Sequence, residues 1–389
     1  MTFQSGANRV AGWAFIVAAA LTPLLAWLGP LGFAALLSVL GVVCLPALRI
    51  SPRETALAIL LLLALAWAAL SSLWSPSRPA TFADSVALKL ALQLILYAAA
   101  WQGARRVDAA IARRALRILA WGLAAYGVLL LVEALTGGAI YSGLRSLMGD
   151  PIRPDLGRKN LAQGSFVLAL IWPVAAAAGF RAGAPLWLGL PMALGTAVLA
   201  QVFLSDAPVL AVGLALGVGA FVWVWPSAGP LLTGLGAAGL VLAMPLLVLA
   251  FRASGIGQPL AISWAERLDY WSYALGRIAE HPLRGWGLDA SRTFSPHIQL
   301  HPHNGALQIW LELGVPGAIL ASLVWAFAFR RLARESRSLM TAATAGSAAV
   351  YLLFGLVSFG VWQEWWLALA ALVAVITGLA DRLDEGAKT

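Results

Sequence analysis

The chain has 389 residues, of which 61% are hydrophobic and only 11% are charged, and its mean hydropathy is +0.84. Because soluble domains carry about 25% charged residues, this composition excludes an ordinary soluble protein. It predicts an all-α, polytopic membrane protein, since helices satisfy their own backbone hydrogen bonds in lipid. The net charge of +9 comes mostly from arginines in short connections, which argues for the lipid bilayer, and against nucleic acid, as a partner.

Apolar runs long enough to cross a bilayer recur along the whole sequence, which we interpret as a single membrane domain over residues 1–389. A hydrocarbon core of about 30 Å needs about 20 apolar residues per helix. This window predicts about twelve transmembrane helices, at 11–28, 30–48, 55–74, 85–101, 115–135, 160–180, 185–204, 207–225, 230–251, 305–328, 340–361 and 365–380. The first is expected to be a retained helix, because its end has no small-residue cleavage site.

Arginines gather in alternate connections and predict the orientation of these helices. They occur at 49–53, 105–114 and 330–337, and the positive-inside rule assigns these loops and both termini to the cytoplasm. Two larger loops, 136–159 and 252–304, then face the periplasm. They hold further cations that orientation does not require: Arg145, Arg153, Arg158, Lys159, Arg252, Arg267, Arg277, Arg284 and Arg292. These cations either bind an anionic ligand or pair with the carboxylates of the same loops.

Two predicted helices begin with polar side chains at the periplasmic side. Lys89, Gln93 and Tyr97 follow one another at a spacing of four and form a polar stripe. In the first large loop, Arg158 and Lys159 precede Asn160, which stands where the next span starts. Cationic side chains beside a helix N-terminus are suited to phosphate or diphosphate. We therefore expect Arg158, Lys159 and Asn160 to contribute to an anion site.

The second large loop contains the stretch SWAERLDYWSYALGRIAEH, which has helical periodicity. Its large apolar residues share one arc of the helix, and they are Trp264, Leu268, Trp271, Leu275 and Ile278. Arg267, Tyr270, Arg277 and His281 share the adjoining arc. This pattern predicts an amphipathic helix at the membrane–water boundary, although packing against the bundle would explain the tryptophans equally well.

The loop ends in HPHN, residues 301–304, directly before an apolar run. Asn304 is a favourable N-cap for a helix beginning at Gly305, and Pro302 restricts the approach to it. The positive end of that helix disfavours an imidazolium. His303 is therefore expected to be a neutral imidazole, the form that a general base needs.

A polar stripe continues from HPHN into the apolar run. Asn304, Gln308 and Glu312 are spaced four residues apart and so share one helix face. A carboxylate inside a membrane helix is costly and indicates a functional site. Gly314 and Pro316 are expected to interrupt the helix just beyond it.

The motifs that the sequence lacks limit the cofactors and substrates that the protein could use. It has no Walker-type loop, Rossmann fingerprint or GxSxG motif, and we predict no cofactor. His297, His301 and His303 provide imidazoles for a metal, but without a nearby cysteine and with a proline between two of them we favour a metal-free site. The substrate is then one that is already activated, such as a lipid-linked diphosphate.

Three stretches resemble the O-antigen ligase and O-antigen polymerase superfamily. GRKNLAQGSFVLALIWP is similar to the entry of a middle span in that family, and ERLDYWSYALGRIAEHPLRGWG to its arginine-led periplasmic helix. HN followed by nine residues and then GVPG is similar to the ligase motif, with His303, Asn304, Gly314 and Gly317 in register.

The resemblance implies a metal-independent glycosyltransferase with the membrane-embedded C-type architecture. It would move a glycan from undecaprenyl diphosphate onto a lipid A-core acceptor at the periplasmic face of the bacterial inner membrane. His303 and Arg267 would be catalytic, with Arg158, Lys159, Asn160, Tyr270, Arg277, Asn304 and Glu312 in contact with substrate. Members of the family often carry a serine–arginine pair where this chain has Ser205 and Asp206, and Arg158 is our substitute for that arginine.

Other functions are compatible with parts of this pattern. A polymerase uses the same chemistry, with a second lipid-linked repeat unit as acceptor. An exporter or flippase would be expected to have related halves and more charges near the membrane midplane, and here only Glu312 and Lys89 qualify. A structural or sensory protein would not need four histidines within one loop.

Overall fold

A computed structural model describes residues 2–49, 51–52, 54–255 and 262–386 of the chain. These residues form fourteen α-helices and four short 3-10 turns, and no strand occurs among them, so the all-α prediction is confirmed. The helices are α1 (Thr2–Leu28), α2 (Gly32–Cys44), α3 (Thr55–Ser71), α4 (Val86–Ala104), α5 (Ala109–Thr136), α6 (Ala139–Leu147), α7 (Pro154–Arg181), α8 (Gly189–Val202), α9 (Asp206–Val224), α10 (Ala228–Ser254), α11 (Ile262–Glu280), α12 (Gly305–Arg330), α13 (Leu339–Val357) and α14 (Glu364–Gly386).

Nine of the described helices are long and apolar enough to cross a membrane. Three shorter apolar helices, at Gly32–Ala47, Thr55–Ser71 and Leu186–Val202, match the remaining predicted spans. The sequence therefore predicts a polytopic membrane protein correctly. Hydropathy alone does not distinguish the full-length helices from the short ones. Pro46 follows the end of one short helix and Pro185 precedes another, and proline limits how far each helix extends.

Two predicted boundaries are wrong in ways that affect the site. Helix α7 begins at Pro154, so Asn160 lies in its second turn and does not cap it. Proline at the first helical position, where its missing N–H is not needed, explains the earlier start. The predicted span 340–361 ends at Val357, and the following residues, 358–363, form a turn between α13 and α14.

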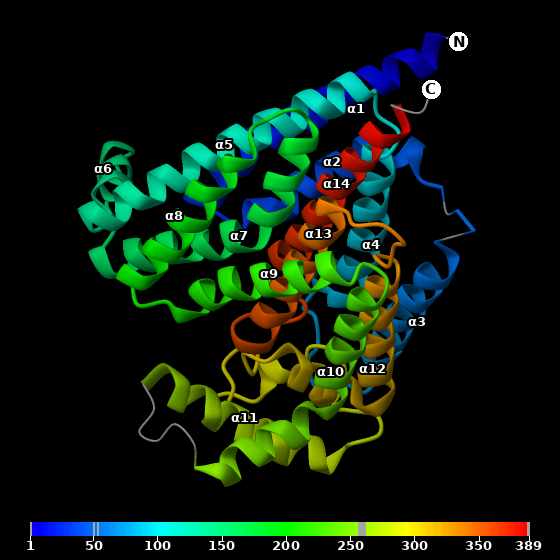
Figure 1. The fold of residues 1–389 in the computed structure, drawn as a ribbon. Helices are drawn as coiled ribbons and strands as arrows, with labels where there is room; N and C mark the ends of the chain where they lie inside the picture. Colours follow the sequence, from blue (N-terminus) through cyan, green and yellow to red (C-terminus); the bar gives the residue numbers. More distant parts are fainter. Residues whose placement is uncertain (1, 50, 53, 256–261, 387–389) are drawn as a thin grey trace.

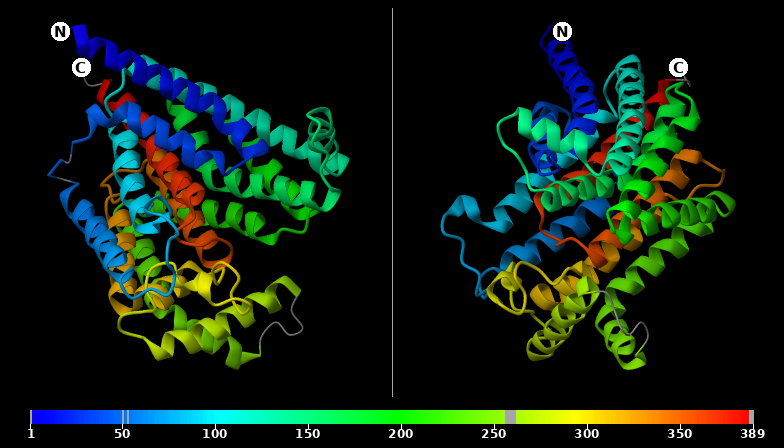
Figure 2. Two further views of the ribbon diagram at one scale, coloured as in Figure 1. Left: turned by 180° about the vertical axis from the view of Figure 1, so that it is seen from behind. Right: turned by 90° about the vertical axis from the view of Figure 1, so that its left-hand side faces the viewer.

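The helices pack in two groups joined by the C-terminal helices (Figures 1 and 2). Helices α1, α7 and α8 each pack on α5, with α7 also in contact with α1 and α8, and α12 lies against α3 and α10. Helix α14 packs on α2, α4, α5 and α7, while α13 packs on α7 and α9. The fully buried Trp366 of α14 belongs to the main core, and so the C-terminal helix occupies a central position.

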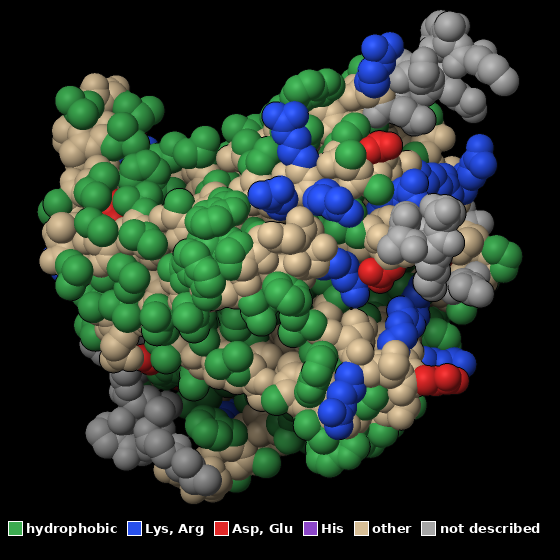
Figure 3. Space-filling model, turned by 45° about the horizontal axis from the view of Figure 1, so that its top comes forward, with side chains coloured by type: hydrophobic (Ala, Val, Ile, Leu, Met, Phe, Trp, Pro, Cys, Tyr) green, Lys and Arg blue, Asp and Glu red, His purple; other side chains and the backbone are tan. Residues whose placement is uncertain are grey.

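The outer surface combines an apolar belt with a cationic side. Figure 3 shows hydrophobic side chains covering most of the left of this face and the Lys and Arg side chains gathered on the right, where both termini lie in Figure 1. Large apolar residues such as Leu135, Leu204 and Leu246 are mostly exposed, as expected for helices that face lipid. Helices α6 and α11 lie on the parts of the molecule away from the termini (Figure 1).

The orientation predicts that 252–304 and 102–112 lie on opposite sides of the membrane. Ser291 and Ala104 would be obvious positions for labelling in these loops, but both are buried in the structure. Gln299 and Ala110 are exposed, and the chain's single cysteine, Cys44, is buried. We expect an impermeant thiol reagent to label Gln299→Cys from the periplasmic side and Ala110→Cys only after the membrane is opened. Labelling of both from one side would contradict the orientation.

Candidate active site

The predicted amphipathic helix is present as α11, and its apolar face packs on the bundle. Trp271 and Ile278 are buried, and they join a cluster with Leu307 and Leu311 of α12. Trp264, Leu268 and Leu275 lie partly buried against the same cluster. Packing against the transmembrane helices therefore accounts for the tryptophans and fixes α11 over the start of α12.

A hydrogen bond joins α11 to HPHN. The indole Nε1 of Trp271 donates to the carbonyl oxygen of Pro302 at 2.9 Å. The adjacent Tyr270 ring stacks on the His303 imidazole, with ring centroids 5.8 Å apart and an interplanar angle of 22°. Tyr270 belongs to the predicted loop helix and His303 to HPHN, and the structure brings their side chains together.

His303 has an unusual backbone conformation and a perturbed imidazole. Its φ is +54°, in the left-handed region that few non-glycine residues adopt. The side chain is partly buried, and its Nδ1 atom is buried without a hydrogen-bond partner among the described residues. Burial, followed by the positive charge of Arg267, lowers the pKa of His303 below its usual value. The ring is therefore neutral at pH 7, as predicted, with burial and Arg267 as the causes.

His301 lies beside His303 but makes different contacts. The two ring centroids are 4.4 Å apart. The His303 backbone N–H donates to Nδ1 of His301 at 3.2 Å, and Nε2 of His301 lies 3.2 Å from the amide of Gln363. Burial, with smaller effects of His303 and Arg292, lowers the pKa of His301 to about 3. His301 is thus a neutral, enclosed residue that holds the backbone of His303.

The predicted cap and polar stripe of α12 are both present. The Asn304 side chain accepts a hydrogen bond from the backbone N–H of Leu307 at 2.9 Å. Gln308 donates to Glu312 at 3.1 Å, and its own Oε1 accepts from the backbone N–H of Val361 at 2.9 Å. The stripe is buried along its length, and it attaches α12 to the turn between α13 and α14.

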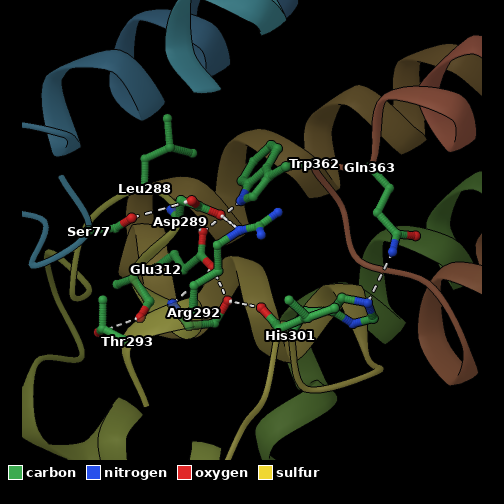
Figure 4. A network of polar contacts seen from close by, with 12 residues as sticks. Ser77, Leu288, Asp289, Arg292, Thr293, His301, Glu312, Trp362 and Gln363 are labelled. Carbon is green, nitrogen blue, oxygen red and sulfur yellow. Dashed lines mark hydrogen bonds and ion pairs between the residues drawn. The ribbon is translucent and has the colours of Figure 1, made fainter. Parts of the chain in front are cut away.

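Glu312 is the centre of a polar network (Figure 4). Its side chain is fully buried. One carboxylate oxygen accepts from the Ser291 hydroxyl at 2.6 Å and from Gln308. The other accepts from the Asp289 backbone N–H at 2.7 Å and from the Trp362 indole at 2.6 Å. These contacts favour a positioning role for Glu312 over direct contact with substrate.

The break in α12 follows immediately and is stabilised by the second large loop. Gly314 has φ +62° and ψ −160°, which interrupts the helix as predicted. The loop fits into this gap, because Trp286 and Gly287 donate backbone hydrogen bonds to the carbonyls of Leu311 and Glu312. A Cβ on Gly314 would lie 2.5 Å from the carbonyl oxygen of Leu283. Only glycine combines this backbone conformation with so close an approach.

The cationic residues of α11 fall into two groups. Arg267 and Tyr270 lie near His303, and the Arg267 guanidinium also lies 5.0 Å from the Trp264 ring. Arg277 pairs with Glu280 at 2.8 Å and covers the Trp286 ring at 4.1 Å. The contacts of Arg277 favour a packing role.

Several of the other loop cations pair with carboxylates, which was one of the two expectations for them. Arg145 pairs with Asp150, Arg153 with Asp155, and Arg292 with Asp289. Arg158 and Lys159 form no ion pair with the described residues.

The group at the start of α7 lies apart from the His303 group. Asn160 donates to the Tyr141 hydroxyl of α6 at 3.0 Å. Helix α7 packs on α5, α8 and α13, whereas α11 packs on α12. The structure thus does not bring Arg158, Lys159 and Asn160 into contact with His303, and any shared substrate has to reach from one group to the other.

Sequence reasoning did not identify the site residues that are remote from HPHN along the chain. Trp362 and Gln363 lie in the turn that follows α13, and they contact Glu312 and His301. Ser291, which also contacts Glu312, lies within the second large loop and belongs to no motif. The polar residues in the stretch VWQEWW could have indicated a site, because they lie between two apolar helices. Among the described residues, no group of three His, Cys, Asp or Glu side chains is placed to hold a metal ion.

The Glu312 network predicts a stability effect. Glu312→Gln replaces one accepting oxygen by a donor group that faces other donors, so we expect a loss of about 1–3 kcal/mol in the free energy of unfolding. Glu280→Gln is the control, because it removes a partly exposed ion pair worth about 0–1 kcal/mol. Unfolding of both variants in mixed micelles would be compared. Equal stability of Glu312→Gln and wild type would contradict the network's role.

A comparison with protein families matches the region that holds this site. A profile described as O-antigen ligase matches residues 191–322, which run from α8 through α11 and HPHN into α12. A protein of Rickettsia conorii named as a candidate polysaccharide ligase is 30% identical over 137 residues, 31% of this chain and 33% of the relative. Similarly named proteins of Rickettsia bellii and Rickettsia typhi are 31% and 28% identical over 138 and 137 residues, covering 31% of this chain and 33% and 34% of those relatives.

The alignment spans about a third of each of these relatives. The profile match includes Arg267, His303, Glu312 and Gly314, and it begins after the start of α7. The helical membrane architecture, the histidine–asparagine motif and the break at Gly314 agree with this match. Over residues 191–322, the chain is thus similar to the O-antigen ligase family.

Proposed function

We propose that the protein is a metal-independent glycosyltransferase of the bacterial inner membrane. It transfers an undecaprenyl-diphosphate-linked glycan to a hydroxyl of a lipid A-core acceptor at the periplasmic face. The observation that carries this proposal is the meeting of three groups: a neutral His303, the Tyr270 ring stacked on it, and the Arg267 guanidinium nearby. The family match over the same residues supports it.

His303 and Arg267 each have a defined chemical task. A sugar hydroxyl is a poor nucleophile at neutral pH, and a neutral imidazole within hydrogen-bond reach accepts its proton as the new glycosidic bond forms. The bond from the sugar to the diphosphate breaks, and the diphosphate leaves with additional negative charge. Arg267 stabilises that charge through its planar fork of N–H donors. The proton stays on His303 until solvent removes it.

The strained position of His303 supports the same assignment. Residues in sparsely populated backbone regions cluster at active sites, where the surrounding structure holds them in place. Here the Trp271–Pro302 hydrogen bond, the His301 side chain and the Asn304 cap restrain the residues on both sides of His303. Such restraint holds a base in a fixed position, which transfer between two bound substrates requires.

Arg158, Lys159 and Asn160 form the second part of the proposal. Their place at an outward end of α7, without an ion pair among the described residues, suits a negatively charged part of the donor or acceptor. One lipid-linked substrate would then extend from this group to His303. Polymerisation, with a second lipid-linked repeat unit as acceptor, uses the same residues and is the alternative.

The activity is tested by reconstitution. Purified protein in liposomes that contain the undecaprenyl-diphosphate glycan would receive either a lipid A-core acceptor or no added acceptor, with EDTA present throughout. We expect glycan on the lipid A-core and release of undecaprenyl diphosphate. Elongated glycan without the acceptor would establish the polymerase, and loss of activity with EDTA that zinc restores would contradict the metal-free mechanism.

Removal of the base predicts a large loss of turnover. His303→Ala should lower the transfer rate by about 10²–10⁴-fold, the usual contribution of general-base catalysis, while donor binding remains. His297→Ala is the control, because His297 is an exposed residue of the same loop that stacks on Tyr273 at 4.5 Å. The rates would be measured at saturating donor. If both variants lost activity equally, His303 would not be the base.

The neighbouring charge predicts a shift in the pH profile. Because Arg267 lowers the pKa of His303, the base stays deprotonated to lower pH than a free imidazole does. Arg267→Gln removes that charge, so the pKa of His303 rises and the acid limb of the rate profile should move to higher pH. Arg267→Lys keeps the charge but loses the fork, and should leave the limb in place while lowering the rate. An unchanged acid limb in Arg267→Gln would contradict the coupling.

A further inference from the structure

A cavity of about 670 Å³ lies on the side of the molecule opposite α11. It is lined by residues from the start of α3, the ends of α4, α7, α12 and α14, and the start of α13. These are the ends that the positive-inside rule assigns to the cytoplasm. None of its lining residues belongs to the His303 group or to the Glu312 network.

The cavity is surrounded by more positive than negative side chains. Five arginines and three carboxylates line it, so positive charge is in excess by two. Two of the arginines are paired, Arg105 with Glu54 at 2.6 Å and Arg181 with Asp384 at 2.8 Å. The remaining carboxylate, Asp381, lies near both of these arginines and near Arg334. Two of the three carboxylates are therefore already paired, and the cavity keeps its excess of positive charge.

The other three arginines come from the end of α12 and the loop after it. They are Arg330, Arg331 and Arg334, and none of them has a carboxylate within 4 Å among the described residues. Arg334 donates to the carbonyl oxygens of Arg331 and Ala333, and the Arg330 guanidinium lies 5.5 Å from the Phe327 ring. Orientation requires arginines on this side, but it does not require three of them to surround one cavity.

An apolar stripe leads along α12 to these cations. Ile319, Leu323 and Phe327 are spaced four residues apart and precede Arg330 and Arg331 by one further turn, so they share one helix face. Ile319 and Leu323 are 45% and 39% exposed, and Phe327 lines the cavity. A molecule with a hydrocarbon chain and a phosphate fits both parts: the chain along the stripe and the phosphate among the guanidiniums.

We propose that this cavity binds the phosphate head group of an anionic phospholipid of the cytoplasmic leaflet. Basic pockets between membrane helices on this side are suited to such head groups. The excess of two positive charges matches a lipid with two phosphates, such as cardiolipin, better than one with a single phosphate. A soluble phosphate compound would use the same arginines but would leave the apolar stripe unoccupied. This site is independent of the glycosyl transfer proposed above.

Lipid retention after purification tests the proposal. Full-length protein would be incorporated into nanodiscs of phosphatidylcholine with a few per cent cardiolipin, then released and weighed by native mass spectrometry. We expect one retained cardiolipin in the wild type. In Arg330→Gln/Arg331→Gln/Arg334→Gln its occupancy should fall by about tenfold or more, since each arginine at a charged surface contributes measurably to anionic-lipid binding.

A matched triple on the same side separates a built site from general charge attraction. Arg113, Arg114 and Arg117 are exposed residues of α5 that do not line the cavity. Changing all three to glutamine removes the same charge and should leave cardiolipin retention unchanged. Equal loss in both triples would overturn the proposal. If the cavity triple did not fold, the single variants Arg330→Gln and Arg331→Gln would each have to reduce retention.

The source of the phosphate is tested separately. Thermal unfolding would be followed in phosphatidylcholine vesicles with added cardiolipin or with millimolar inorganic phosphate. Cardiolipin should raise the melting temperature of the wild type and of the α5 triple, but not of the cavity triple. If inorganic phosphate gave the same increase as cardiolipin, the ligand would be a soluble anion and the lipid assignment would be wrong.

Discussion

The buried carboxylate of Glu312 is the interaction on which the candidate site depends. A charge inside a membrane helix is tolerated only where protein groups replace water. Here those groups come from three parts of the chain: the second large loop, the preceding turn of α12, and the α13–α14 turn. Ser71 of α3 and Ser75 just after it hold the loop through Leu288. Each donor is needed to keep the carboxylate satisfied. In satisfying it, they also fix the loop that ends in His303.

This requirement explains why structural and chemical roles are divided along one short sequence. His301, Asn304 and Gln308 are buried and engaged with other protein groups, while His303 between them retains a buried Nδ1 without a partner. A residue that accepts a substrate proton, as proposed for His303, needs a ring nitrogen that is not already bonded to the scaffold. The neighbouring residues make the hydrogen bonds that fix the loop. The backbone of His303 between them adopts the left-handed conformation.

Local features of this fold were predictable and distant ones were not. The apolar helices, the Asn304 cap and the interruption at Gly314 follow from neighbouring residues, and hydropathy, capping and glycine rules identify them. The donors to Glu312 from Ser291 and Trp362 lie 21 and 50 residues away along the chain, and no periodicity signals such a pairing. The start of α7 was predicted six residues too late, because a hydropathy window detects only apolar residues. The first turns of α7 are polar and fall outside such a window.

The position of Trp362 and Gln363 has a consequence for biosynthesis. A membrane protein is inserted from its N-terminus, so α12 and its carboxylate enter the bilayer before the α13–α14 turn has been made. Until Trp362 and Gln363 have been made, Glu312 lacks its indole donor and His301 lacks its amide partner. The loop around His303 can reach its final arrangement only after the chain has been made as far as Gln363. Truncated products, which retain the histidine–asparagine motif, therefore lack an assembled site.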